Sequence, residues 1–408
     1  MTDKPAISRY ALMSLIAASL GMFVGAGVTI IYAASVFVPA IVADTGWSRS
    51  GVTAAIAPAA LAIALSTPIV GALTDRYGPR RVLIVAAFPY AASLAAISIV
   101  SINVSMFTAA LTVAAIFSAA TTPVAYSRLI IGWMPEQRGL GMGIAMAFSG
   151  LGVAVVPALL AQFLPSIGWK IGYAILGMAA LLVILPTAIF LVKDPPRREV
   201  PKVDVAYRQR GTSTDLTFKE ALGTPAFWTL SAGFLLNGLT ATAGSISLPL
   251  VAGDHGVAPA VAATTMISVG LSMVVSRVVV GALFDRLPAI LLAAIIFCAP
   301  VLAYLMLIAN VGFPGFIVAA LLFGIAVGTE GDAMAVILSK RFGLRGFGKI
   351  FGVNFAAYAL CGGLGPWLLT TLRSTLASDR LAFLYLAAIG LAAVIAISFN
   401  RSSQLGHE

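Results

Sequence analysis

The sequence predicts an all-α membrane protein in which twelve transmembrane helices form two six-helix pseudo-symmetric repeats. Of its 408 residues, 60% are hydrophobic and only 10% are charged, whereas soluble domains average about 25% charged residues. The apolar residues fall in runs of about the length that crosses a bilayer. One short motif also recurs 210 residues further along the chain, at 71–76 and 281–286. These observations argue against a soluble globular enzyme.

Twelve apolar segments account for most of the chain. We expect spans that begin near residues 10, 51, 82, 106, 139, 170, 226, 258, 289, 314, 349 and 379. Each is expected to be helical, because a helix satisfies its own backbone hydrogen bonds in lipid. The first apolar run continues to about residue 42, too long for a cleaved leader, and is expected to be a retained helix. Cys298 and Cys361 lie inside predicted spans, where we expect unpaired thiols.

The net charge of +10 is distributed unevenly. With the N-terminus placed inside, 19 of the 25 Lys and Arg residues fall on cytoplasmic segments, four fall outside and two lie within spans. This asymmetry follows the positive-inside rule. The charge therefore indicates membrane orientation with both termini cytoplasmic, and no nucleic-acid partner is expected.

The repeat extends well beyond the motif. At the same offset, Asp44 matches Asp254 and Asp75 matches Asp285. An even number of spans separates the copies, so both run in the same direction. The predicted organisation is an N-terminal half over 1–192, a charged, Pro-containing cytoplasmic linker over 193–225 and a C-terminal half over 226–408. Two parallel repeats with a binding site between them are typical of transporters.

The stretch "GALTDRYGPRR" at 71–81 resembles the loop signature between the second and third helices of the major facilitator superfamily, and 281–286 is a weaker copy. The resemblance covers the whole chain in helix count and repeat. It implies gating loops that close the cytoplasmic side, and the alternative is a charged loop that only anchors topology. The implied gating residues are Gly71, Asp75, Arg76, Gly78, Arg80, Asp285 and Arg286.

A narrower resemblance connects the chain with the monocarboxylate carriers and the oxalate–formate antiporter group. It rests on "GWSRS" (46–50), "WMPEQRGLGMGIAMAFSGLG" (133–152) and "RVVVGALFDR" (277–286). The hallmark of these families is an arginine in the eighth helix four residues before a glycine, here Arg277 and Gly281. The chain departs from both groups. Its first helix has no lysine, Met273 stands where animal carriers have an acid, and the eleventh helix has no buried lysine.

Four charged residues lie well inside predicted spans: Arg128, Arg277, Glu330 and Asp332. Such residues cost about 2.5–3.5 kcal/mol each at the bilayer centre and normally mark a pathway. The repeat mate of Arg277 is Thr67, so this charge is not duplicated. A guanidinium stays protonated and binds a carboxylate through two parallel hydrogen bonds. We therefore expect Arg277 to bind the carboxylate of a substrate, the alternative being a structural pair with Glu330 or Asp332.

The two acids lie two residues apart on one helix, a rotation of about 200°, so they face different directions. One interpretation is a proton-coupling site, and the other is a permanent salt bridge to Arg128 or Arg277. Arg128 is either a second anion contact or gate, or a structural residue. Further polar candidates for the substrate site are Tyr32, Tyr126, Asn237, Asn354 and Tyr358, although such residues often serve only as helix–helix hydrogen bonds.

The prediction is a secondary active transporter of a small organic anion, preferably a monocarboxylate moved with a proton by alternating access. Alternatives are an anion exchanger that includes dicarboxylates, and a cation or drug exporter that uses Glu330 or Asp332. A membrane enzyme is disfavoured because no triad or metal-ligand spacing is visible, and a pure receptor is also disfavoured. No cofactor or metal is expected, and there is no nucleotide-binding Gly-x-x-x-x-Gly-Lys-Ser/Thr stretch. The expected form is a monomer in a bilayer, the bacterial inner (plasma) membrane.

Overall fold

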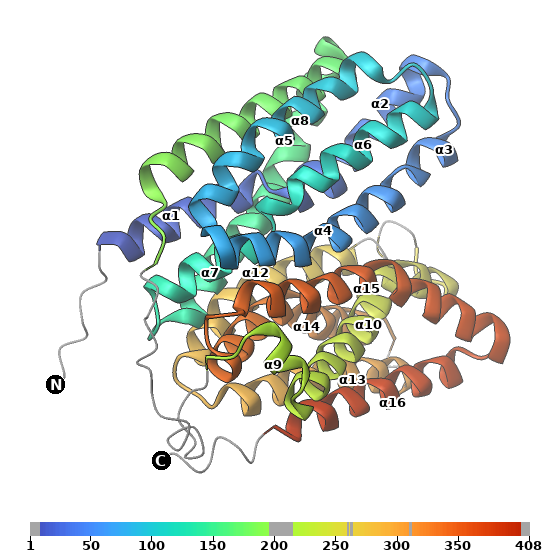
Figure 1. The fold of residues 1–408 in the computed structure, drawn as a ribbon. Coiled ribbons are helices and arrows are strands. Elements are labelled where there is room, and N and C mark those ends of the chain that lie inside the picture. The colour runs from blue at the N-terminus through green and yellow to red at the C-terminus, as the bar shows by residue number, and fades with distance from the viewer. Residues whose placement is uncertain (1–8, 196–214, 259–260, 262–263, 310–311, 401–408) are drawn as a thin grey trace, which may run out of the picture. The chain divides into compact units, whose positions relative to one another are not determined.

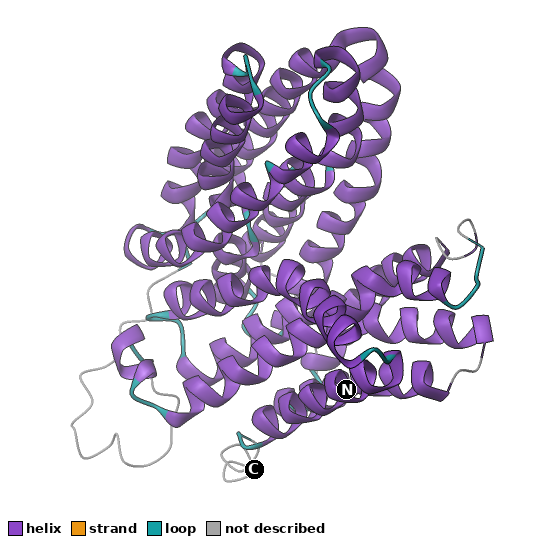
Figure 2. Cartoon of the chain, turned by 90° about the vertical axis from the view of Figure 1, so that its right-hand side faces the viewer, coloured by secondary structure: helices purple, strands orange, loops and turns teal. Residues whose placement is uncertain are grey.

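The computed structural model describes residues 9–195, 215–258, 261, 264–309 and 312–400, and these residues form helices without any strand (Figures 1 and 2). Eleven of the described helical segments are long and apolar enough to cross a membrane. One of them, Arg138–Leu191, is interrupted at Gly168, which has φ of 77°. Because a positive φ is readily adopted by glycine and ends a helix, this segment is two spans in series. The predicted twelve-span fold is confirmed.

The elements of the N-terminal half are helices, several of which continue one another within a single span. Their bounds are α1 Arg9–Phe23, η1 Gly27–Tyr32, α2 Ala34–Thr45, α3 Arg49–Ala54, α4 Ile56–Tyr77, α5 Pro79–Val100, α6 Val104–Ser118, η2 Ala119–Thr121, α7 Pro123–Trp133, α8 Arg138–Pro186 and η3 Thr187–Leu191. Several turns carry ordinary capping chemistry. The Asn103 side chain, for example, accepts the backbone N–H of Met106 at the start of α6.

The elements of the C-terminal half are longer and mostly unbroken. Their bounds are α9 Phe218–Leu222, α10 Pro225–Asp254, α12 Thr264–Phe284, α13 Ala289–Ala309, α14 Gly312–Phe342, α15 Phe347–Leu376 and α16 Asp379–Ser398. The short helix α9 begins with a capping box between Thr217 and Glu220. It precedes α10, in which Pro225 occupies the first turn, where a missing N–H is tolerated.

The chain divides into two compact units, each with its own apolar core. Unit 1 comprises Met1–Glu136, Ile144–Asp215 and Phe342–Ala356, and unit 2 comprises Gln137–Gly143, Leu216–Arg341 and Ala357–Glu408. Each unit therefore includes a short segment from the other half of the sequence, the first turns of α8 in unit 2 and the first turns of α15 in unit 1. The boundaries 1–192, 193–225 and 226–408 stay predictions, and 196–214 of the linker lies outside the described residues.

Two spans of unit 1 are broken where they meet. The first span passes from α1 through Gly25 and Ala26 into the π-helix η1, and the fourth passes from α6 through η2 into α7. The backbone N–H of Ala26 donates to Thr121 Oγ1 at 2.9 Å, and a Cβ on Gly25 would lie 2.9 Å from the carbonyl oxygen of Thr121. Freed backbone groups at membrane depth need such partners, so the two breaks stabilise each other.

Candidate functional site

The buried charged residues of unit 2 gather around α14. Glu330 and Asp332 are both fully buried, and Arg277 on α12 is 9% exposed. The Arg277 side chain reaches α14, where its Nε donates to the carbonyl oxygen of Gly328 at 2.9 Å. Gly328 itself packs against the α12 backbone, because a Cβ there would lie 2.8 Å from Cα of Met273. The close approach permitted by this glycine fixes the arginine against the helix that carries both acids.

Asp332 and Glu330 have different surroundings. Neither oxygen of Asp332 has a hydrogen-bond partner among the described residues, and the positive charge that acts on it is that of Arg277. Glu330 Oε2 instead accepts a hydrogen bond of 2.9 Å from Nδ2 of Asn237 on α10. The two acids, expected to be rotated by about 200° from one another, therefore differ in their surroundings: the charge of Arg277 acts on Asp332, and the amide of Asn237 bonds to Glu330.

Tyr358 lies next to this group, because its hydroxyl donates to the carbonyl oxygen of Val327 at 3.3 Å. Four elements of unit 2 thus contribute predicted site residues to one neighbourhood: Arg277 from α12, Asn237 from α10, Glu330 and Asp332 from α14 and Tyr358 from α15. In the sequence, the three charged residues were identified by their positions inside apolar spans and Asn237 and Tyr358 as polar candidates, but nothing indicated how they pair. The hydrogen bond from Arg277 to the Gly328 carbonyl oxygen was not predicted from the sequence, in which only a glycine one turn before Asp332 is visible.

The other predicted site residues belong to unit 1. Tyr32 is 48% exposed at the end of η1. Tyr126 is buried on α7, and its hydroxyl, against Gly21 of α1, has no hydrogen-bond partner in the described part of the chain. Asn354 is buried and donates to the carbonyl oxygen of Ile350 one turn back in α15, at 2.9 Å. Their roles in binding stay predictions.

Unit 1 also contains a buried hydroxyl pair that the sequence analysis did not single out. Thr29 on η1 and Tyr90 on α5 share a hydrogen bond, and Thr29 also donates to the carbonyl oxygen of Gly25 at 3.1 Å. Neither residue is charged and each lies in an apolar run, so only their juxtaposition with the broken first span distinguishes them.

Asp75, near the end of α4, organises one end of unit 1. Its two carboxylate oxygens accept the backbone N–H groups of Gly348 and Lys349, both at 2.9 Å, at the start of α15. Arg128 of α7 forms an ion pair with the same carboxylate. A carboxylate is favourable at a helix N-terminus, where unpaired N–H groups and the helix dipole meet. Arg128 is thus ion-paired with Asp75.

The second copy of the motif repeats this arrangement in unit 2. Asp285 accepts the backbone N–H groups of Gly139 and Leu140, at 2.8 and 2.9 Å, at the start of α8. Burial raises the pKa of Asp285 above its ordinary value, an effect that these two N–H bonds oppose. The recurrence of the motif thus has a structural correlate, since each acid binds the N-terminus of the fifth helix of the other sequence repeat.

The remaining loop residues have more local contacts. Gly78 has φ of 85° and a carboxylate, that of Asp194, packed against its Cα. The backbone N–H of Arg80 donates to this Asp194 at 3.0 Å, and the Arg80 guanidinium donates to carbonyl oxygens at the end of the sixth span. Arg76 lies over the ring of Tyr77, and Arg286 is exposed. Gating by these loops stays a prediction.

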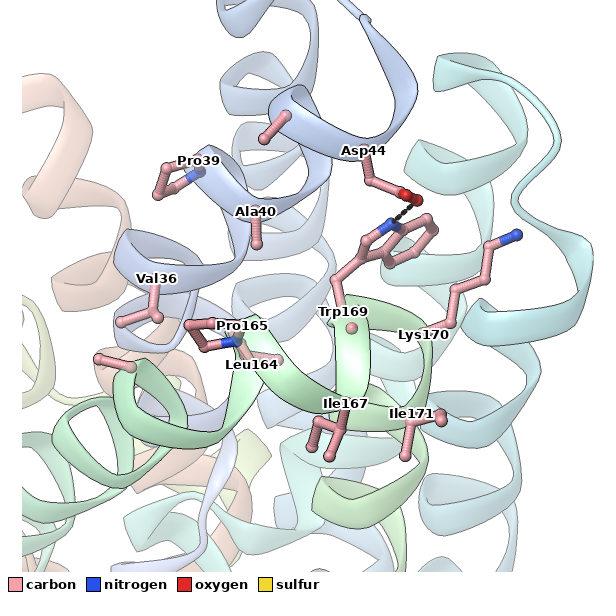
Figure 3. Close-up of a pocket in the computed structure, with 13 residues that line it drawn as sticks. Val36, Pro39, Ala40, Asp44, Leu164, Pro165, Ile167, Trp169, Lys170 and Ile171 are labelled. Carbon is pink, nitrogen blue, oxygen red and sulfur yellow. Dashed lines mark hydrogen bonds between the residues drawn. The ribbon is translucent and has the colours of Figure 1, made fainter.

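A pocket of about 810 Å³ lies elsewhere in unit 1, between α2 and the bend of α8 at Gly168 (Figure 3). Its lining is mostly apolar, and its charged members are Asp44 and Lys170. Trp169 donates from Nε1 to Asp44 Oδ2 at 2.8 Å, which ties the end of α2 to the start of the sixth span. None of the predicted site residues lines this pocket, so it is distinct from the charged cluster of unit 2.

The fold and the buried charged cluster define a polytopic membrane transporter, and comparison with known proteins identifies its family. The model of the Major Facilitator Superfamily matches residues 11–366, and the chain belongs to that family. It is therefore a multi-pass membrane transporter and not an enzyme. The match is to the superfamily, so membership in the monocarboxylate or oxalate–formate group stays a prediction.

Curated relatives are distant. YhjX of Escherichia coli, an uncharacterized transporter of this family, is 26% identical over 56% of each chain, and YcxA of Bacillus subtilis, also uncharacterized, is 23% identical over 73% of each. The probable sulfoacetate transporter SauU of Cupriavidus necator is 28% identical over 40% of this chain and 37% of its own length. The matches to the first two relatives span about half of those proteins, 56% for YhjX and 49% for pytF of Aspergillus terreus.

Solved structures show the same fold over nearly the whole chain. The proton:xylose symporter XylE has a TM-score of 0.74 at 16% identity and covers 96% of this chain and 95% of its own. FucP in its outward conformation has a TM-score of 0.71 at 14% identity, over 96% and 99% of the two chains. The human organic anion transporter TETRAN has a TM-score of 0.70 at 14% identity, over 97% and 100%. At these identities the likeness establishes architecture alone.

Proposed function

We propose that the protein is a secondary active transporter of a small organic anion, preferably a monocarboxylate, that moves its substrate with a proton by alternating access. The observation that carries this proposal is the position of Arg277. It is the charged residue that the second repeat adds where the first has Thr67, and it is 9% exposed inside a membrane span. A permanent positive charge at such a position favours an anionic cargo.

The anchoring of Arg277 supports this role. With Nε bound to the Gly328 carbonyl oxygen, the guanidinium is held in one orientation before substrate arrives. Pre-organisation of this kind reduces the entropy lost on binding. Thr67, in contrast, bonds only to the carbonyl oxygens of Ala64 and Gly352, so the first repeat offers no equivalent cation at this position.

Proton coupling follows from the charge balance around Arg277. In the absence of substrate, the negative charge of Asp332 balances that of Arg277, the cation that acts on it. A substrate carboxylate bound to Arg277 adds one negative charge to a buried site, and a proton on an acid of α14 restores neutrality. Burial of an uncompensated charge is costly, so substrate and proton bind together. The similarity to the probable sulfoacetate transporter SauU supports the anion class, because sulfoacetate is an organic anion.

The competing proposal is a cation exporter in which Glu330 and Asp332 bind the cargo. The observation that favours it is that three carboxylate oxygens of these fully buried acids have no hydrogen-bond partner among the residues that the structure describes. Against it stands Arg277, whose charge repels a cation from the face of α14 that carries Asp332. An anion exchanger would share the arginine and differ only in lacking a coupled proton.

The test is thermal stabilisation of the purified protein by a panel of monocarboxylates, dicarboxylates and organic cations. A ligand at a hundredfold its dissociation constant stabilises the folded state by about 2.7 kcal/mol. We expect a monocarboxylate to stabilise the wild type but neither Arg277→Ala nor Arg277→Lys, because lysine lacks the bidentate fork. The control Arg380→Ala removes an exposed charge and should respond like the wild type.

Two results would contradict the proposal. Stabilisation by organic cations alone would support the exporter, and stabilisation of the Arg277 variants equal to that of the wild type would make Arg277 structural. An exchanger would be identified by two results together. Dicarboxylates would stabilise the protein, and vesicles loaded with one anion would take up another without acidification of the vesicle interior.

A further inference from the structure

Asn237 and Glu330 form a fully buried side-chain pair between α10 and α14 with an incomplete set of hydrogen bonds. One contact is made, from Asn237 Nδ2 to Glu330 Oε2 at 2.9 Å. The other oxygen of each group, Asn237 Oδ1 and Glu330 Oε1, has no hydrogen-bond partner among the described residues. Buried polar atoms are rarely left without a partner, so this double deficit needs an explanation.

The deficit has a simple chemical form. Both unsatisfied atoms are acceptors, and an ionised glutamate has no donor to offer. A protonated carboxyl group has one O–H donor, and an amide has one acceptor oxygen beside its N–H donors. A single proton on Oε1, donated to Oδ1, would therefore satisfy both atoms and leave the existing contact unchanged.

We propose that Glu330 is a neutral carboxylic acid in the resting transporter at neutral pH and that it shares its proton with Asn237 in a closed, two-hydrogen-bond acid–amide pair. The site binds one proton, with Glu330 Oε1 as the base and Asn237 Oδ1 as the acceptor of the bound proton. The pair joins α10 to α14. Loss of the proton would leave two acceptors and a buried negative charge at this contact.

The groups around the pair support neutralisation by a proton. A Cβ on Gly238 would lie 3.0 Å from Tyr358 and 3.3 Å from Cys361, both on α15, and 3.2 Å from Glu330 Oε1. These two neighbours are neutral in their ordinary forms. On α12 the positive charge is Arg277, which acts on Asp332. No ion pair joins Glu330 to a described cationic side chain, and an isolated buried carboxylate becomes neutral rather than stay charged.

A metal cation fits the site less well than a proton. Hard cations such as Ca²⁺ and Mg²⁺ take about six or more oxygen ligands. The described residues contain no group of three His, Cys, Asp or Glu side chains suited to a metal, and this pair offers two unsatisfied oxygens. One proton completes the pair without any further ligand.

The two acids of α14 then have different roles. Glu330 keeps its proton as a standing contact between helices, and Asp332, which faces Arg277, is the acid that exchanges a proton with substrate. This division rests on the proposed function. The proton on Glu330 does not, because it is inferred from the complete burial of the pair and from the two acceptor oxygens. The backbone of Gly238 and the amide of Asn237 are the polar groups that act on this carboxyl group, and neither carries a charge that would balance an ionised form.

The test is infrared spectroscopy of the purified protein at pH 7, in H₂O and D₂O, on the wild type, Glu330→Gln and Asp332→Asn. We expect the wild type to show the carbonyl stretch of a protonated carboxylic acid with a deuterium shift. The band should be lost in Glu330→Gln and kept in Asp332→Asn. Absence of the band in the wild type, or its persistence in Glu330→Gln, would overturn the proposal.

Thermal stability provides an independent check. Glutamine reproduces both hydrogen bonds, because its NH₂ can donate to Asn237 Oδ1 while its oxygen accepts from Nδ2. Glu330→Gln should keep the wild-type apparent melting temperature, whereas Glu330→Ala and Asn237→Leu should lower it. A loss of stability in Glu330→Gln as large as in Glu330→Ala would also overturn the proposal. Neither readout uses a substrate, so failure of the anion panel would leave both results interpretable.

Discussion

Individual residues in this protein are defined by the partners that the fold assigns to them. Arg128 and Arg277 both stand as single arginines in apolar runs, yet Arg128 forms an ion pair with Asp75 near the end of α4 and Arg277 donates to the backbone carbonyl of Gly328 on α14. Arg128 is therefore tied to a carboxylate at the end of its span, whereas the contact from Arg277 Nε reaches the helix that carries both buried acids. The two arginines therefore have different expected consequences when mutated.

Asp332→Asn tests the exchange. Under the proposed function, wild-type uptake of a carboxylate rises as the external pH falls, because substrate and proton bind together. The asparagine variant is neutral at every pH, so uptake should lose this pH dependence and the ability to concentrate substrate against a gradient, while binding is retained. Uptake in proteoliposomes measures both properties.

Glu330→Gln is the matched control for this prediction, since it changes the neighbouring acid in the same way. It should keep the pH dependence of the wild type. If Asp332→Asn retained full pH-dependent accumulation and Glu330→Gln lost it, the roles of the two acids would be reversed.

At the scale of helices, glycines determine where elements from different repeats approach one another. A Cβ on Gly281 of α12 would lie 2.6 Å from the carbonyl oxygen of Gly139, and a Cβ on Gly143 would collide with the Arg277 carbonyl group. Close helix approach through small residues is typical of membrane proteins. These contacts bring the first turns of α8 against α12, next to the carboxylate of Asp285 that binds the α8 N-terminus.

Gly281→Ala tests this packing. The added methyl group meets a backbone oxygen that has no side-chain freedom to move, so we expect a lower apparent melting temperature and reduced transport. Gly270→Ala, on the same helix, is the control, because a Cβ there meets nothing within 4 Å. Alanine is favoured over glycine within a helix by up to about 1 kcal/mol, so the control should be neutral or slightly stabilising. Equal effects of the two substitutions would contradict the packing argument.

At the scale of the whole molecule, the asymmetry of Lys and Arg predicts orientation in the membrane. By the count of spans, the connection between the fourth and fifth spans is expected on the same side of the membrane as Asp75, and the connection after the seventh span on the other side. Glu136 and Ala258 are exposed in these two connections. The orientation that the charge distribution predicts places Glu136 inside and Ala258 outside.

Labelling of single cysteines tests this orientation. In a background without Cys298 and Cys361, a membrane-impermeant maleimide added to intact bacterial cells should label Ala258→Cys and leave Glu136→Cys unlabelled until the membrane is opened. The reverse pattern would place the N-terminus outside and assign the gating loops to the other face.

The sequence by itself determined the class, the twelve spans, the repeat and the identity of the buried charges. These features follow from composition and periodicity, which act locally along the chain: an apolar run of sufficient length must be a helix in lipid, and a charge within it is conspicuous. The family match to residues 11–366 confirms the superfamily.

Only the tertiary structure decided which groups pair. Asn237 and Glu330 are 93 residues apart and Asp75 and Lys349 are 274 apart, and no local rule relates the rotation of one helix to the position of another. The energetic reason is that a buried polar atom must find a donor or acceptor wherever the packing places one. The partner of each charged residue, and hence its chemistry, is therefore a property of the assembled helices.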